Sequence, residues 1–214
     1  LVIYFIIPKR MRCIWLLMAS YYFYMNWNPK YALLIAFSTI ITYLSGIFLE
    51  KTKLIIEEHQ KMLLQKAIVF FSFFVNIGIL VFFKYFTFLL DNLNKTIEWL
   101  GGEGIVNGWD IILPVGISFY TFQALSYTVD VYKGKLHAEK NIFRYALFVS
   151  FFPQLVAGPI ERSTNLLKQI ERLEDIKVWD YNRIASGCIL MLWGFFQKMV
   201  IADRVAILVD TVYS

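Results

Sequence analysis

Long apolar runs separated by short charged clusters constrain this chain more than any other feature of its sequence. Seven such runs follow one another, at 1–7, 13–27, 31–49, 67–90, 111–132, 145–160 and 184–202. Most approach the roughly 20 residues that a helix needs to cross a bilayer. Only 17% of the residues are charged, whereas soluble domains average about 25%. The pattern predicts an all-α, polytopic transmembrane protein.

Basic residues gather in alternate loops between these runs. Lys and Arg cluster at 9–12, 50–66 and 133–144, whereas the loop at 91–110 holds one lysine beside four acids. By the positive-inside rule, the basic loops face the cytoplasm and 91–110 lies outside. The same rule accounts for the net charge of +5, so no nucleic-acid partner is predicted.

The run at 145–160 is interrupted by the stretch FFPQLVAGPIERS. Pro153 and Pro159 each remove a backbone donor, and Pro153 and Gly158 bracket a centre that we expect to be unwound. Both flanks of the run are basic, so both ends belong on the cytoplasmic side, which a single crossing cannot satisfy. Non-helical backbone at membrane depth requires protein cover or a wet cavity. We therefore predict a re-entrant segment; the alternative is a kinked helix that simply tolerates proline.

The segment 163–183 is amphipathic. Charged and polar residues separate five apolar residues at helical spacing: Leu166, Leu167, Ile170, Leu173 and Ile176. This spacing predicts a helix on the cytoplasmic side that lies on the membrane surface. A helix that packs on a cytoplasmic partner fits the same residues equally well.

The run at 111–132 carries a polar and aromatic stripe. Steps of three and four residues place five residues on one helical face: Gly116, Tyr120, Gln123, Tyr127 and Asp130. Polar groups at membrane depth face protein or a water-filled path, because lipid cannot hydrogen-bond them. The stripe therefore predicts either a substrate path or hydrogen bonding between helices.

The sequence contains few candidates for catalysis. His59 and His137 both lie in charged loops with no partner evident in the sequence, so neither is predicted to be a catalytic base. Cys13 and Cys188 lack metal-ligand spacing, and no metal site is predicted. The motifs of serine hydrolases, zinc proteases and P-loop proteins do not occur. Transporters also carry proline- and glycine-interrupted segments, so these residues alone leave a transporter open.

Two long motifs resemble a known family. LPVGISFYTFQALSYTVDVYKGK followed by FVSFFPQLVAGPIERS is similar to the membrane-bound O-acyltransferase family, and most to its bacterial branch of alginate O-acetylation and D-alanyl-lipoteichoic-acid transfer proteins. LLMASYYFYMNWNPKYALLI and WGFFQKMVIADRVA resemble the same branch. The resemblance implies acyl transfer to a hydroxyl at the bacterial cytoplasmic (inner) membrane. It implies no bound cofactor, and an acyl donor that reaches a funnel from the cytoplasm as co-substrate, either acetyl-CoA or an acyl carrier.

The polar stripe and the break indicate which residues line that funnel. They are Tyr120, Gln123, Tyr127 and Asp130 from one motif, and Pro153, Gln154, Gly158, Pro159 and Glu161 from the other. The family's membrane-embedded histidine lies downstream of the matched region, and neither histidine of this chain falls at it. We therefore expect 1–214 to be the N-terminal part of one transmembrane domain, without a catalytic residue and inactive alone.

Substrates and partners follow from the resemblance as expectations. The acceptor is expected on the outer side, as alginate, another polysaccharide or teichoic acid, reached in some members with extracytoplasmic partner proteins. An acetyl donor fits the alginate-type match better than an alanyl carrier. Two alternatives stay open, a flippase-like transporter and a scaffold of an envelope-polymer complex. A histidine within a downstream apolar helix would favour the enzyme.

Overall fold

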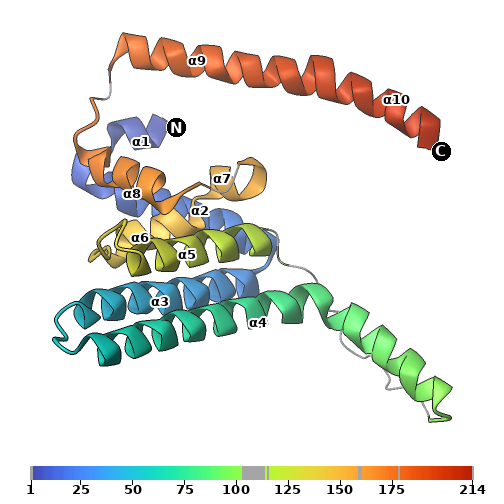
Figure 1. Ribbon diagram of the computed structural model, residues 1–214. Coiled ribbons are helices and arrows are strands. Elements are labelled where there is room, and N and C mark those ends of the chain that lie inside the picture. Colours follow the sequence, from blue (N-terminus) through green and yellow to red (C-terminus); the bar gives the residue numbers. More distant parts are fainter. Residues whose placement is uncertain (1, 103–113, 115, 159–160, 178, 214) are drawn as a thin grey trace. The chain divides into compact units, whose positions relative to one another are not determined.

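The structure is a computed structural model that describes residues 2–102, 114, 116–158, 161–177 and 179–213. Within these ranges every regular element is a helix (Figure 1). The chain divides into two compact units, Leu1–Glu174 and Asp175–Ser214. Three helices are long and apolar enough to cross a membrane, namely Pro29–Thr52, Glu58–Trp99 and Tyr181–Tyr213. The predicted all-α polytopic architecture is therefore confirmed.

The first unit begins with short helices that lead into the first candidate span. Its early elements are α1 (Val2–Ile6), a 3-10 turn (Lys9–Met11), α2 (Arg12–Trp27) and α3 (Pro29–Thr52). The Asn28 side chain caps α3 by accepting from the Lys30 N–H at 3.0 Å, and Pro29 occupies the first turn. Proline is favoured there because the first helical N–H groups lack a partner within the helix. At 24 residues, α3 reaches about 36 Å, which exceeds the hydrocarbon core.

The next helix, α4 (Glu58–Trp99), is much longer than the predicted span at 67–90. It absorbs most of the predicted cytoplasmic loop at 50–66 and the start of the predicted outer loop. The helical turns at both ends of α4 are rich in polar residues but contain no proline or glycine, so the helix continues through them. It ends at Trp99, and Gly101, with a φ of 82°, turns the chain out of the helix so that the Gly102 N–H donates to the Ile97 carbonyl at 2.9 Å.

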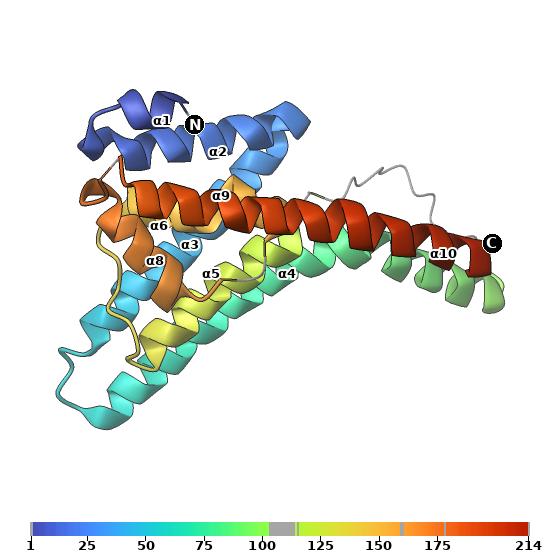
Figure 2. The same cartoon turned by 90° about the horizontal axis from the view of Figure 1, so that it is seen from above.

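The remaining helices of the first unit are α5 (Ile117–Tyr132), α6 (Ile142–Ser150), α7 (Phe152–Ala157) and α8 (Ser163–Glu171), followed by a 3-10 turn at Arg172–Glu174. Figures 1 and 2 show α5 alongside both α3 and α4, while α6 lies between α2 and α8. Side-chain hydrogen bonds join the layer formed by α3, α4, α5 and α6. Ser38 of α3 donates to Asn76 of α4 at 2.5 Å, and Tyr145 of α6 donates to Thr42 of α3 at 2.7 Å. Such small polar residues hold membrane helices together.

The amphipathic segment forms a shorter helix than 163–183. Its helical part ends at Glu171, and the 3-10 turn ends at Glu174. Leu167 and Ile170 are buried, and α8 packs against α5 and α6 of the same chain. The apolar face is thus covered by other helices of the same unit. The sequence had predicted that this face meets the membrane surface or a cytoplasmic partner. Its position relative to a membrane stays a prediction.

The second unit is one helical rod. It consists of α9 (Tyr181–Phe196), a π-helical segment (Gln197–Ala202) and α10 (Asp203–Tyr213). The seventh apolar run lies within it. In a π-helix the backbone hydrogen bonds join residues five apart, which brings their side chains to the same side of the helix, and Lys198 pairs with Asp203 five residues further on. The ion pair therefore follows from the local helix geometry.

Candidate functional site

The predicted break exists, but it lies earlier than expected. Helix α6 ends at Ser150, Phe151 is extended with a ψ of 101°, and α7 begins at Phe152. Pro153 occupies the first turn of α7, where its missing N–H is tolerated. The expectation of an unwound centre between Pro153 and Gly158 is therefore wrong. The proline cannot extend α6, so the chain ends one helix and starts another.

The chain then turns back on itself along α5. Residue 145 lies beside residue 127, residue 155 lies at the N-terminal end of α5, and residue 163 returns close to the C-terminal end. The contacts in chain order are Tyr145 with Tyr127, Phe148 with Gln123, Leu155 with Gly116, and Ser163 with Asp130. Gly116 and Asp130 are separated by about 21 Å of helix. The chain thus runs along α5 and back again, and whether it does so as a re-entrant segment in a membrane stays a prediction.

Two glutamines hold the break together. Gln123 of α5 donates to the Phe148 carbonyl at 2.7 Å and accepts from the Gln154 side chain at 3.0 Å. Helix continuity would have paired that carbonyl with the N–H of Phe152, which instead donates to the Ser20 hydroxyl of α2 at 3.4 Å. Gln123 is 1% exposed and Gln154 8% exposed. Side chains of α5 and α2 therefore satisfy the backbone groups that the break releases.

The other residues of the stripe occupy one face of α5, as predicted. Tyr120 and Tyr127 are both buried, and the Tyr127 hydroxyl accepts from the Glu139 N–H at 3.0 Å. Asp130 is half-buried and accepts from the Ser163 hydroxyl at 2.5 Å. The face thus serves helix packing and contacts the returning segment. A role in a substrate path stays a prediction for these residues.

The residues predicted from the second motif separate into different settings. Pro153 is exposed, whereas Glu161 is half-buried and accepts from the Asn165 side chain at 2.9 Å. Gly158 closes α7 through a 2.7 Å bond from its N–H to the Gln154 carbonyl, and a Cβ there would lie 2.8 Å from the Gln154 Cα. Only glycine fits that approach. Pro159 lies outside the described residues.

Sequence reasoning missed two contributors from α2. Ser20 receives the freed N–H of Phe152, and Tyr24 lies one turn further along the same helix, beside Gly116. Both are buried, with exposed fractions of 0% and 4%. The signal in the sequence is weak, because it consists of one serine and one tyrosine four residues apart in an apolar run. Only the fold shows that both side chains face the break.

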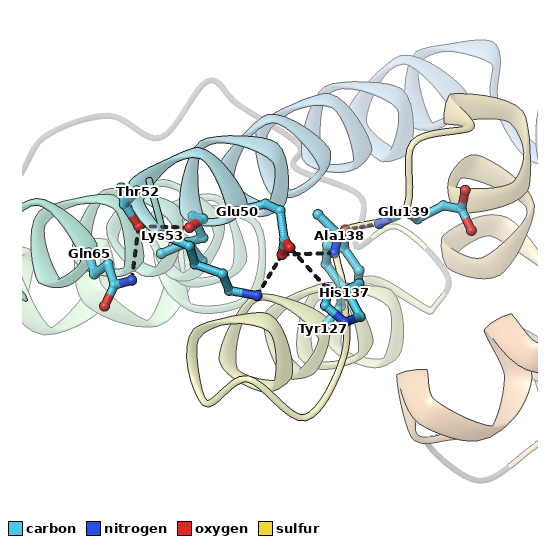
Figure 3. A network of polar contacts seen from close by, with 9 residues as sticks. Glu50, Thr52, Lys53, Gln65, Tyr127, His137, Ala138 and Glu139 are labelled. Carbon is cyan, nitrogen blue, oxygen red and sulfur yellow. Dashed lines mark hydrogen bonds and ion pairs between the residues drawn. The ribbon is translucent and has the colours of Figure 1, made fainter. Parts of the chain in front are cut away.

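A second polar cluster fixes the loop that follows α5 (Figure 3). Glu50, near the end of α3, pairs with Lys53 at 2.7 Å and with His137 Nδ1 at 3.0 Å, and accepts from the Ala138 N–H at 3.4 Å. The side chain of His137 is 92% exposed. His137 is therefore a surface partner of a carboxylate, and the cluster anchors the loop at 133–141 to α3.

Replacing Glu50 with glutamine is expected to loosen this loop. The amide retains one acceptor oxygen but loses the charge that serves Lys53 and His137, so the N–H groups of Ala138 and Glu139 should exchange hydrogen severalfold faster. Global stability should change by less than about 1 kcal/mol, because the groups are partly exposed. Hydrogen-exchange mass spectrometry of the loop peptide measures the effect.

The matched control for that experiment is Glu58→Gln. Glu58 forms a similar pair with Lys61 at 2.9 Å, within α4. Its loss should leave exchange at 133–141 unchanged. Equal exchange in the wild type and the Glu50 variant would show that the cluster does not anchor the loop.

The fold defines a class of protein: an all-α membrane protein whose broken helix turns back beside a buried polar face. Comparison with known proteins gives the family. The chain is 35% identical over 99% of its length to the "Probable alginate O-acetylase AlgI" of Pseudomonas aeruginosa. It is 31% identical over 92% of its length to the "Peptidoglycan O-acetyltransferase" of Helicobacter pylori. A shorter match, 26% identical over 41% of the chain, is to the "Teichoic acid D-alanyltransferase" of Lacticaseibacillus rhamnosus.

The chain belongs to the membrane-bound O-acyltransferase family. It spans about two fifths of the length of the curated relatives it matches, with 39% of the Pseudomonas protein and 40% of the Helicobacter protein covered. No family model and no solved structure matches it. The predicted family is therefore confirmed by relatives that cover nearly all of this chain.

Proposed function

We propose that the complete protein is a membrane-embedded O-acyltransferase that O-acetylates an extracellular or cell-envelope polysaccharide of the alginate type. The observation that carries this proposal is the 35% identity, over 99% of the chain, to a protein named as an alginate O-acetylase. The peptidoglycan O-acetyltransferase relative supports the same transfer to another envelope polymer. The teichoic acid match supports acyl transfer to such polymers more broadly.

The proposed reaction moves an acetyl group to a sugar hydroxyl. The bond between the acetyl group and its donor breaks, an ester forms at the hydroxyl oxygen, and the hydroxyl proton leaves with the donor group. Acetyl-CoA or an acyl carrier supplies the group from the cytoplasmic side, without a bound cofactor. The catalytic histidine that the family resemblance implies is neither His59 nor His137. The protein acts in the bacterial inner membrane as a multi-pass protein, with extracytoplasmic partners that deliver the acceptor.

This chain contributes a wall of the donor funnel in the proposed enzyme. The in-and-out segment brings Gln154 to the middle of α5, where Gln123 accepts from it at 3.0 Å. A position at the middle of α5 suits a segment that separates a donor on one side of the membrane from an acceptor on the other. The buried, hydrogen-bonded glutamine pair also excludes water, which would hydrolyse a reactive acyl donor.

Mass spectrometry of envelope polysaccharides tests the proposal. Cells with the complete gene should carry O-acetyl groups that disappear on deletion and return on complementation, while the amount of polymer stays constant. Unchanged O-acetyl content would contradict an acetyltransferase. Unchanged acetylation with reduced polymer export would instead identify a transporter or a scaffold of the polymer complex.

A further inference from the structure

A groove runs between the two candidate spans α3 and α4, close to the loop that joins them (Figure 1). It consists of two hollows of about 330 Å³ and 320 Å³, which share the side chains of Phe48, Leu64 and Ile68. Along α3 the groove extends from Lys51, in the last turn, to Ile41. That length of helix is about 15 Å, half of a hydrocarbon core about 30 Å thick. The groove is therefore as long as one leaflet of a bilayer is deep.

The walls of this groove are apolar. Side chains from both helices line it and remain about half exposed, for example Phe48 at 49% and Phe71 at 59%. The hydroxyl groups of Ser45 and Thr52, which also line it, already donate to carbonyls within α3 at 2.8 Å and 2.7 Å. The groove thus suits a hydrocarbon chain, which has no group that needs a hydrogen bond.

A lysine stands at the end of the groove that lies next to the loop. Lys51 lines the groove, is exposed, and has its ammonium 5.9 Å from the centre of the Phe48 ring. It has no carboxylate partner among the described residues, whereas Lys53 and Lys61 each pair with a glutamate, at 2.7 Å and 2.9 Å. An apolar groove one leaflet deep, with an unpaired cation at its mouth, matches the shape and charge of a lipid with an anionic headgroup.

We propose that the groove binds one anionic phospholipid of the phosphatidylglycerol type, with an acyl chain between α3 and α4 and its phosphate at Lys51. Basic groups between membrane helices attract anionic headgroups. A zwitterionic lipid such as phosphatidylethanolamine carries an ammonium of its own beside its phosphate, so it gains less from the lysine. Headgroups lie at both faces of a bilayer, so the site requires no particular orientation of the loop at 53–57.

Photocrosslinking of the purified complete protein in phosphatidylcholine vesicles tests this site. One sample contains a small fraction of phosphatidylglycerol with a diazirine halfway along one acyl chain. The other contains phosphatidylethanolamine with the same diazirine at the same fraction. Mass spectrometry should locate adducts within 41–51 and 64–71. The yield from phosphatidylglycerol should exceed that from phosphatidylethanolamine about fivefold, the factor expected for one lysine beside an anionic headgroup.

Three variants identify which part of the groove holds the lipid. Lys51→Gln should lower the phosphatidylglycerol yield to that of phosphatidylethanolamine. Ala67→Trp places an indole in the groove from the exposed side of α4, so it should lower both yields. Lys61→Gln is the matched control, because it also removes one positive charge, but from an ammonium that Glu58 already binds. Both yields should stay at the wild-type level in this control.

The contrary outcomes are distinct. Equal yields from the two lipids in the wild type would mean that the groove holds bulk lipid without selecting a headgroup. No adducts in these segments from either lipid would mean that another part of the protein covers the groove. An excess of phosphatidylglycerol that persists in Lys51→Gln would mean that the phosphate binds elsewhere. Each of these results overturns the proposal, and none depends on acyl transfer, so the proposed function is tested separately.

Discussion

Replacing Gln123 with leucine is expected to abolish acyl transfer by the complete protein and to destabilise it. The change removes the 2.7 Å bond to the Phe148 carbonyl and the acceptor of the Gln154 amide. Both groups are buried, and each buried polar group left without its partner costs about 1–3 kcal/mol. The break would lose the bond that holds it to the middle of α5. Thermal unfolding in detergent and acetyl-transfer rates measure the two effects.

Two further variants separate function from folding. Gln154→Ala leaves the bond from Gln123 to Phe148 in place, so it should lower turnover with a smaller loss of stability. Gln169→Leu is the control, since that glutamine is exposed on α8 and bonds only its neighbour Asn165 at 3.1 Å among the contacts seen. Normal turnover in Gln154→Ala at normal expression would remove Gln154 from the candidate site.

Gly46→Ala is expected to destabilise the protein by about 1–3 kcal/mol, the usual cost of overpacking a core. A Cβ on Gly46 would lie 2.5 Å from the Tyr127 hydroxyl and 2.7 Å from a carbon of its ring. The ring cannot yield easily, because Tyr127 is fully buried and its centroid lies 4.5 Å from that of Tyr145. The clash would push α3 away from α5, and the melting temperature should fall.

Gly78→Ala is the matched control for that change. Gly78 also lies within a long apolar helix, but a Cβ there would meet no atom within 4 Å. Alanine is the better helix former, so this variant should be neutral or more stable by about 0.5–1 kcal/mol. Opposite signs for the two substitutions are expected. A neutral Gly46 variant would mean that Tyr127 has room to move.

The sequence predicted the helices and the break because both depend on local chemistry. Apolar runs indicate spans, and a proline interrupts a helix wherever it falls beyond the first turn. The stripe on α5 followed from helical spacing and is seen on one face. The position of the break was less predictable, since a proline tolerates the first turn of a new helix as well as it ends an old one.

Partners distant in the chain could not be predicted from one sequence. Ser20 meets Phe152 across 132 positions, and Glu50 meets His137 across 87. No local pattern joins such residues, because their approach results from the packing of whole helices. The length of α4 was missed for another reason, as its polar end turns resemble loops in composition but keep helix-forming residues.

The length of α4 has a mechanical consequence. Its 42 residues span about 63 Å, whereas a bilayer with its headgroups is about 40–45 Å thick. A helix this long must tilt, bend or project into water. Helix α4 packs against α3 and α5 and extends past them (Figure 1). We therefore expect a force on the protruding end of α4 to be transmitted to α3 and α5. Whatever binds that end would shift the layer that carries the glutamine pair.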